Sequence, residues 1–403
     1  MRLINKLVLM VYLLLLFSLI ACSSYNKKRS ETTETNRLEE INKITIERHP
    51  SAADYTMMFG KLDKLPEESD FGYDLRSTDL SDCDLSGEYN KLLQATFDSK
   101  TIWPDKLPDS FIPEEIMEQY KNPGLNLRSL HEKGITGKGV GIAIIDQPLL
   151  VDHIEYKDQI KYYSERDTVN TQEAAMHGAA VASIAVGKNV GVAPEADLYY
   201  IADDYLRIQY DYSLLAESIN KLLDINKSLR IENRIRVISI SWGYDSREAQ
   251  GSKDLIKAYK RAEDEGILVI TTSLHLRENM EFFGLDKIPL SDPDDVNSYT
   301  KNLYGINNKK YNISVPMNFR CTASPTGTTD YVVYREGGKS WATPYIAGLY
   351  ALACQVKQDI SYKEFWKLAS ATSRTSGGTF EGKSYEATYI IDPIALIKKL
   401  ERD

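Results

Sequence analysis

Three side chains stand where a hydroxyl group could be activated to attack a carbonyl carbon. Asp146 ends the apolar run Gly141-Ile-Ala-Ile-Ile-Asp, His177 precedes a helical pattern of small residues, and Ser340 follows two glycines and precedes another apolar helical pattern. A carboxylate can orient a histidine, which can then take the proton of a serine hydroxyl. A serine at a helix N-terminus also lies beside N–H groups that favour developing negative charge. The predicted chemistry is hydrolysis through an acyl-enzyme on Ser340.

The elements that must position these residues are predicted from apolar runs and their spacing. The runs that suit buried strands are Val140–Ile145, Leu198–Ile201, Val237–Ile240 and Ile267–Ile270. Apolar residues at helical spacing lie between them, at Leu214, Leu215, Ile219, Leu222 and Leu223, and again at Leu255, Ile256, Tyr259 and Ala262. Strands that alternate with helices predict an α/β fold with a central, mostly parallel sheet. In such sheets functional groups lie beyond the carboxyl ends of the strands, where Asp146 stands.

The chain order Asp, His, Ser and the residues around each of them resemble the subtilisin-like serine protease family. Ser340 matches the nucleophile in the family's Gly-Thr-Ser-Met-Ala-Thr-Pro block, and His177 matches the base in its His-Gly-Thr-His-Val-Ala-Gly block. Asp146 matches the acid that follows the family's strand ending in Ile-Asp. The resemblance implies that these three residues form a catalytic triad.

Two further blocks support the resemblance, which covers residues 124–403. Gly191-Val-Ala-Pro looks like the family's Gly-Val-Ala-Pro segment, and Ser241-Trp242-Gly243 lies in a stretch similar to its substrate-binding edge. The resemblance implies a three-layer subtilisin-like fold. It also implies an endopeptidase that acts on protein or peptide substrates as a monomer and without a cofactor.

The sequence departs from the family at the oxyanion hole. The family has an asparagine at the end of a strand that leads into the site, and His275 occupies that place here. Removing an oxyanion donor costs about 10²- to 10³-fold in rate. Because an imidazole N–H can also donate, we expect His275 to serve, with Asn279 as another candidate and the Ser340 backbone N–H as second donor. Lys339 and Trp341 also replace the Thr and Met that flank the family's serine.

Two other classes of protein remain open. A non-catalytic subtilase fold, or pseudoprotease, would bind peptides or regulate a partner, and the replacement of the asparagine by His275 motivates that alternative. An esterase-like hydrolase would use the same three residues, and comparing peptide with ester substrates separates it from a protease.

The first 21 residues are predicted to be an export signal. Arg2 and Lys6 provide a positive start, Leu7 to Ile20 is apolar, and Leu-Ile-Ala-Cys22 resembles a bacterial lipobox. A lipobox implies cleavage before Cys22, a lipid on that cysteine, and retention on the outer face of the cell membrane. A plain secretory signal or an uncleaved anchor is the alternative.

Downstream of the signal we expect a polar tether at residues 22–50, an N-terminal extension at 51–123 and the peptidase domain at 124–403. Within the extension, Asp74-Leu75, Asp79-Leu80 and Asp84-Leu85 recur every five residues. This period is similar to a pentapeptide-repeat coil, in which the leucines point inward; a polar loop with three leucines by coincidence is the alternative. A removable propeptide and a permanent spacer are both open for this segment.

Composition restricts the partners and cofactors. The net charge is −9, and no long block of Lys and Arg follows the signal, so nucleic-acid binding is not expected. Cys83, Cys321 and Cys354 have no metal-binding spacing and are expected to be buried thiols. The run Asp292-Pro-Asp-Asp lacks a recognisable calcium-ligand spacing, so a solvated turn is expected there and no metal site is indicated.

Overall fold

The computed structural model describes residues 44–56, 60–69, 72–167, 169, 171–203, 211–243, 249–273, 280–304, 310–380 and 382–402. The chain divides after residue 44 into two units, and all the elements described below belong to the second. The predicted signal, Cys22, His275 and Asn279 lie outside the described residues. Among the residues that are described, no helix is long and apolar enough to cross a membrane.

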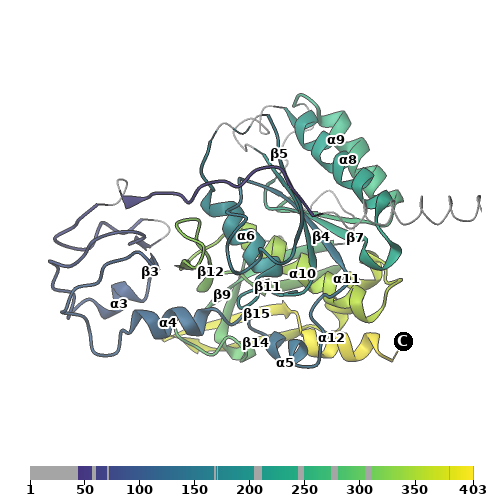
Figure 1. Ribbon diagram of the computed structural model, residues 1–403. Helices are drawn as coiled ribbons and strands as arrows, with labels where there is room; N and C mark the ends of the chain where they lie inside the picture. The colour runs from purple at the N-terminus through teal and green to yellow at the C-terminus, as the bar shows by residue number, and fades with distance from the viewer. Residues whose placement is uncertain are drawn as a thin grey trace, which may run out of the picture. The chain divides into compact units, whose positions relative to one another are not determined.

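A six-stranded parallel sheet forms the centre of this unit, as predicted (Figure 1). Its strand order is β1-β5-β6-β4-β7-β8. The strands are β1 (Thr45–Ile46), β4 (Gly141–Asp146), β5 (Ile160–Glu165), β6 (Asp197–Ala202), β7 (Ile235–Ile240) and β8 (Leu268–Thr271). The prediction of β4, β6, β7 and β8 from apolar runs is confirmed. The edge strand β1 and its neighbour β5 were not predicted, because their sequences mix polar and apolar residues.

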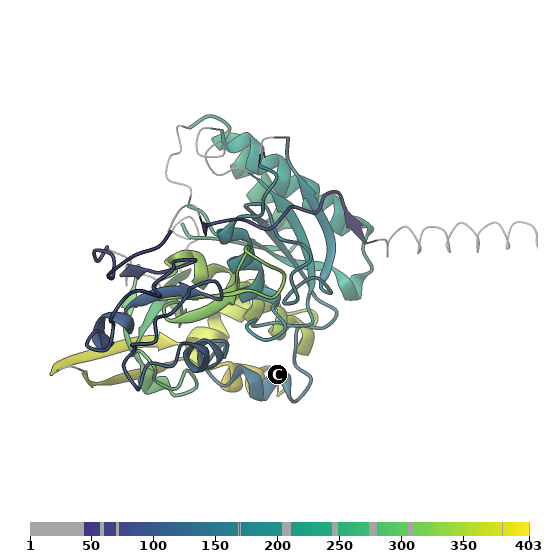
Figure 2. The same ribbon diagram turned by 60° about the vertical axis from the view of Figure 1, so that its left-hand side comes forward.

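Helices cover both faces of the central sheet (Figures 1 and 2). They are α6 (Met176–Val186) and α10 (Lys339–Val356) on one face, and α8 (Tyr212–Ser228) and α9 (Ser252–Asp264) on the other. Alternation along a strand explains the two layers. In β4, Ile142 and Ile144 join the core that contains α6 and α10, whereas Ala143 and Ile145 join the core that contains α8 and α9.

The two helix pairs differ in their burial. Residues 178–186 of α6 and residues 341–354 of α10 are buried without interruption. Helix α9 is amphipathic, and Ile256, which we included in its apolar stripe, is 50% exposed. That part of the prediction was wrong because Ile256 follows the fully buried Leu255 by one residue, and one residue of an α-helix turns about 100° away from the buried face.

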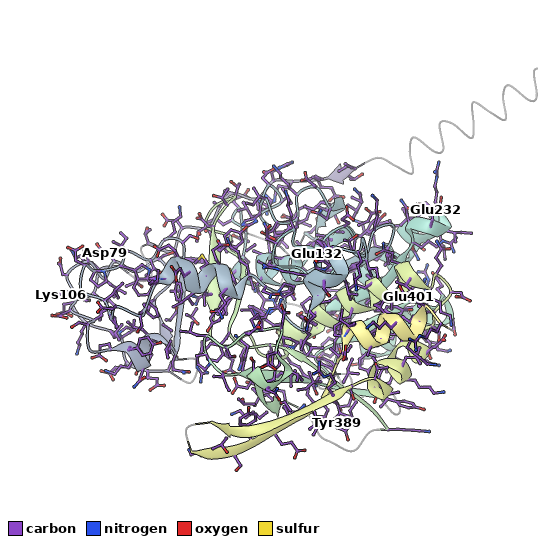
Figure 3. The ribbon with its side chains drawn as sticks, turned by 90° about the horizontal axis from the view of Figure 1, so that it is seen from below. Asp79, Lys106, Glu132, Glu232, Tyr389 and Glu401 are labelled. Atoms are coloured by element: carbon purple, nitrogen blue, oxygen red, sulfur yellow. The ribbon has the colours of Figure 1, made fainter. Side chains whose placement is uncertain are left out.

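A five-stranded sheet with the order β10-β9-β11-β15-β14 contributes to the core that contains α10. Its strands are β9 (Met280–Lys287), β10 (Tyr299–Leu303), β11 (Tyr311–Pro316), β14 (Arg374–Phe380) and β15 (Lys383–Ile390). Other helical segments among the described residues after position 124 are α5 (Leu127–His131), α11 (Tyr362–Ala371), α12 (Pro393–Leu400) and the short 3-10 turns Ile231–Asn233 and Val296–Ser298. Figure 3 shows the β14–β15 hairpin, with Tyr389 labelled on β15.

Residues 51–123, the predicted extension, share a third sheet with residues that follow position 124. Its order is β12-β13-β3-β2, formed by β2 (Tyr73–Asp74), β3 (Ala95–Asp98), β12 (Arg320–Ala323) and β13 (Tyr331–Tyr334). Strand β3 pairs antiparallel with β13 through Phe97 opposite Val333. The extension also contains α3 (Tyr89–Leu92) and α4 (Pro113–Tyr120). Residues 73–98 and residues 320–334, which are far apart in the sequence, therefore build one sheet.

The five-residue period of the extension has a structural basis. Leu75, Leu80 and Leu85 are buried, which confirms that these leucines point inward. The carbonyl of each accepts a hydrogen bond from the N–H group three residues later, so a tight turn follows each leucine. Isolated parallel bridges join Asp79 to Ile102 and Asp84 to Lys106. The segment is a set of turns around a shared apolar interior.

The three cysteines that the structure describes are free and buried, as predicted. Burial is the main cause that raises their thiol pKa values, to about 12 for Cys354. Thiols with raised pKa values are poor nucleophiles at neutral pH, so these cysteines serve packing.

Candidate active site

Asp146 and His177 form a buried hydrogen-bonded pair. Strand β4 ends at Asp146, and α6 begins one residue before His177. The His177 Nδ1–H donates to Asp146 Oδ1 at 2.8 Å; the Asp146 side chain is fully buried and that of His177 is 18% exposed. The Gln147 backbone N–H donates to the same oxygen at 2.8 Å. The pair fixes the tautomer in which Nε2 carries the lone pair.

Gly178 allows α6 to begin this close to the end of β4. A Cβ atom at this position would lie 2.4 Å from the Gln147 carbonyl oxygen and 2.7 Å from the Tyr200 hydroxyl. The Tyr200 hydroxyl itself donates to that carbonyl at 2.5 Å. A larger side chain at residue 178 would push the start of α6, and His177 with it, away from Asp146.

Two opposing causes set the pKa of His177. Burial disfavours the charged imidazolium and lowers the pKa, whereas the charge of Asp146 and its hydrogen bond raise it. The second pair of effects is larger in sum, so the pKa of His177 lies above the ordinary value of 6.5. His177 is therefore a stronger base than an isolated histidine.

Ser340 is the second residue of α10. The helix follows Gly338, whose φ of 63° is easily adopted only by glycine. The Ser340 hydroxyl donates to the Ser241 carbonyl at 3.1 Å, and the Ser241 hydroxyl donates to the Ser340 carbonyl at 2.8 Å. These two hydrogen bonds hold the start of α10 to the segment that follows β7.

The predicted substrate-binding residues follow β7 directly. Ser241 contacts Ser340, as described above, and Trp242 packs against Tyr212 of α8 with ring centroids 5.7 Å apart. Gly243 lies beside the end of β8, since a Cβ atom there would be 2.6 Å from Ser273 Oγ. Residues 241–243 therefore contact Ser340 at one end and lie beside Ser273, two residues before His275 in the sequence, at the other.

Trp341 connects the site to residues that sequence reasoning missed. Its ring packs edge-on against His177, with centroids 5.4 Å apart at 64°, and against Tyr334, with centroids 5.2 Å apart at 88°. The Arg76 guanidinium lies 5.6 Å from the centroid of the Tyr334 ring. No signal in the sequence links Arg76 to Tyr334, because 258 residues separate them.

Lys339, next to Ser340, is turned toward β9. Its Nζ lies 3.3 Å from Glu281 Oε1 and 4.4 Å from the centroid of the Phe282 ring. Burial lowers the pKa of Lys339, and the charge of Glu281 partly opposes that effect. The ion pair therefore joins the start of β9 to the start of α10.

No group of three His, Cys, Asp or Glu side chains suited to a metal ion occurs among the described residues. In the predicted turn at residues 292–295, Asp292 accepts a hydrogen bond from the Asp294 backbone, and Asp295 accepts one from Asn297. Asp294 accepts hydrogen bonds from the Asn122 side chain and the Asn126 backbone. These carboxylates organise the turn and fix it to residues 122–126.

Residues 137–273 match the Subtilase family. The resemblance to the subtilases that was predicted from the sequence is confirmed over this range, which includes Asp146, His177 and residues 241–243. Ser340 lies beyond it, so its place in the site rests on the geometry given above. The match to the subtilases supports a serine protease as the class of the protein. No curated protein matches the sequence.

Three solved structures show similarity to this chain at low sequence identity. The prenylagaramide maturation protease PagA has a TM-score of 0.46 and 18% identity, over 68% of this chain and 98% of PagA. The PatG macrocyclase domain has a TM-score of 0.47 and 16% identity, over 62% of this chain and 87% of that domain. The PatG macrocyclase in complex with peptide has a TM-score of 0.46 and 15% identity, with the same coverage.

Proposed function

We propose that this chain is a subtilisin-like serine endopeptidase whose catalytic triad is Asp146, His177 and Ser340. The observation that carries the proposal is the buried 2.8 Å hydrogen bond between Asp146 and His177. Ser340 lies at the N-terminus of α10, and α10 packs against α6, which carries His177. The match to the Subtilase family supports the same class of enzyme.

The proposed mechanism assigns one role to each residue. Ser340 Oγ attacks the scissile carbonyl while His177 Nε2 takes its proton, and the same nitrogen returns the proton to the leaving amine. Asp146 holds the imidazole and stabilises its charged form. Water then hydrolyses the acyl-enzyme, with His177 acting again as the base. These steps need no cofactor.

Substrate binding completes the proposal. We propose that the substrate peptide binds along Ser241, Trp242 and Gly243, because Ser241 is hydrogen-bonded to Ser340. For the tetrahedral oxyanion we assign the Ser340 backbone N–H and a side-chain donor from His275, with Asn279 as the alternative.

One observation favours a second candidate, a subtilase fold that binds peptides without cleaving them. The Ser340 hydroxyl donates its hydrogen to the Ser241 carbonyl, so this hydrogen is not directed to His177. In a protease the hydroxyl would rotate on substrate binding, because catalytic hydrogen bonds often tighten only in the complex. In a pseudoprotease it would stay with Ser241.

A fluorophosphonate probe, which reacts only with activated serines, separates the two candidates. We expect purified wild-type protein to be labelled, and labelling to disappear in both Ser340→Ala and His177→Ala. Ser86→Ala is the matched control, because Ser86 is an exposed serine of the extension and its hydroxyl bonds only to Asp84 among the described residues. Folded wild type that fails to react, or Ser340→Ala that still reacts, would contradict the protease assignment.

We also propose that the enzyme is held by a lipid on Cys22 at the outer face of the cell membrane. The lipobox-like tetrad Leu-Ile-Ala-Cys22 and the apolar run before it support this assignment. Wild-type protein is expected to partition into detergent and to incorporate labelled fatty acid, whereas Cys22→Ser should do neither. Equal partitioning of the two proteins would exclude the anchor.

A further inference from the structure

Arg76, in the N-terminal extension, is rigidly held. Its Nε donates to Asp74 Oδ1 at 2.9 Å and its NH2 donates to Asp74 Oδ2 at 2.6 Å, which is a two-point contact between planar groups. Its NH1 donates to the Tyr334 hydroxyl at 3.4 Å, and its guanidinium lies over the Tyr334 ring. The extension therefore reaches the last residue of β13, six residues before Ser340.

The contacts continue from Tyr334 to the catalytic histidine. Trp341 lies between the Tyr334 and His177 rings and packs edge-on against both. Gly337 makes room for it, because a Cβ atom at that residue would lie 2.2 Å from the Trp341 ring. Trp341 is 2% exposed, and its Nε1 has no hydrogen-bond partner among the described residues. A buried hydrogen-bond donor without a partner destabilises the fold, so hydrogen bonding does not explain a tryptophan at this position. We therefore assign the role of Trp341 to its ring contacts with Tyr334 and His177.

The extension also approaches His177 along the chain that leads into α6. Ser51 N–H donates to the Gln172 carbonyl at 3.0 Å, and Ala174 N–H donates to the Ser51 carbonyl at 2.9 Å. Tyr55 follows closely and forms a hydrogen bond with the backbone of Met176, the residue before His177. The start of α6 is thus paired with residues of the extension, and the His177 ring is packed by Trp341.

Part of the hydrophobic core belongs to both the extension and the peptidase domain. Leu75, Leu80 and Phe97 are in one buried cluster with Cys321 and Val333. Cleavage and release of the extension would expose this cluster and remove the strand that pairs with β13. A removable propeptide, by contrast, is expected to leave the core of the mature domain buried after it is released.

We propose that residues 45–123 are a permanent part of the active site, and that Arg76 positions His177 through Tyr334 and Trp341. The inference rests on the proposed function, since it assigns His177 as the base. The edge-on contact with Trp341 and the hydrogen bond to Asp146 together restrict the rotation of the His177 ring. A misplacement of about 1 Å in such a site can cost about 10²-fold in rate.

Four variants test the positioning role in the full-length protein. Trp341→Ala is expected to lower kcat by about ten- to a hundredfold with little change in KM, and Trp341→Phe should recover most of the loss because it keeps an aromatic ring against His177. Arg76→Leu is expected to lower kcat by about three- to tenfold. Lys106→Ala is the matched control: it breaks the 2.8 Å ion pair with Asp84 in the same extension, at the outer end that Figure 3 shows.

A readout that does not depend on catalysis is the low-field proton NMR signal of the His177 Nδ1–H group bonded to Asp146. We expect this signal in wild type and in Lys106→Ala, and a shifted or broadened signal in Arg76→Leu and Trp341→Ala at temperatures where each variant remains folded. Unchanged signals and unchanged kcat in both variants would overturn the inference. Failure of the wild type to react with the fluorophosphonate would instead contradict the proposed function, and the NMR comparison would still decide the positioning role.

Intact-mass measurement of the labelled protein tests whether the extension is permanent. The labelled chain is expected to retain residues 45–123. A labelled, active chain that begins near Gly124 and has no extension bound would show that the extension is a propeptide, and would overturn the inference.

Discussion

Helices α6 and α10 lie on one face of the central sheet and α8 and α9 lie on the other, and the two pairs differ in how much of their surface the protein covers. The first pair is built largely from small and apolar residues and is buried on all sides after its first residues. The second pair has one apolar face and one charged face, as in helix α9 with Leu255 buried and Lys257 exposed.

This difference explains where the proposed chemistry lies. His177 and Ser340 are each the second residue of a buried helix, and the contacts around α6 and α10 fix both backbones. The exposed faces of α8 and α9 carry many charged residues, but such surface positions tolerate movement and substitution. A site that needs fixed distances is thus carried by the layer that can move least.

The largest expected effect within the buried layer is on pH dependence. The fluorophosphonate reaction needs neutral His177. Burial is the largest single influence on the pKa of His177 and lowers it, but the charge of Asp146 and its hydrogen bond together outweigh burial and raise the pKa above 6.5. The labelling rate should therefore fall about tenfold per pH unit on the acid side of an inflection that lies above 6.5. Measuring the rate from about pH 5 to about pH 9 locates the inflection.

As pH rises, the contact between Asp146 and His177 is expected to contribute less to stability while the labelling rate increases. A histidine whose pKa is raised by folding contributes stability that is fully present below its unfolded pKa and is lost as pH rises through the folded pKa. Activity should thus appear over the pH range in which this contribution disappears. An inflection below 6.5 would mean that desolvation dominates and that the contact with Asp146 is weaker than the structure indicates.

A smaller effect is expected where the two buried helices meet. Gly348 of α10 lies where a Cβ atom would come 2.6 Å from Val192 Cβ and 3.3 Å from the Ala185 carbonyl of α6. Gly348→Ala should therefore lower the free energy of unfolding by about 1–3 kcal/mol, although alanine usually favours a helix over glycine. Urea denaturation measures this change.

The smallest effect is expected on the opposite layer, where Ile256 serves as the control. It is 50% exposed on α9, so Ile256→Lys should change the free energy of unfolding by less than about 0.5 kcal/mol. If Gly348→Ala is as mild as Ile256→Lys, the two layers do not differ in the way that their packing implies.

Most of the central sheet could be predicted from the sequence, because each of the buried strands β4, β6, β7 and β8 contains a continuous run of apolar residues. The structure joins Asp146 to His177 by a hydrogen bond, at the end of β4 and the start of α6. That Ser340 completes a triad with them stays a prediction. The prediction was weaker for α9, where Ile256 was assigned to the core although it lies beside the apolar face rather than on it.

The rest of the site depends on contacts that a local pattern does not encode. Trp341 was recognised as unusual, but its contact with His177 follows from the room that Gly337 leaves. Tyr334 and Arg76 gave no signal, because they meet only through the pairing of β3 with β13. The edge strand β1 was not predicted for a similar reason, since its position depends on its pairing with β5 and not on a local sequence pattern.

The pairing of β3 with β13 also has a consequence for synthesis of the chain. Tyr331 N–H donates to Ser99 Oγ across 232 residues, and contacts of such long range form late in folding. The extension leaves the ribosome before β13, so β3 cannot form its pairing with β13 until the chain has been made up to Tyr334, six residues before Ser340. A nascent chain therefore cannot complete this sheet, or the proposed active site that depends on it, until residues 331–340 have been made.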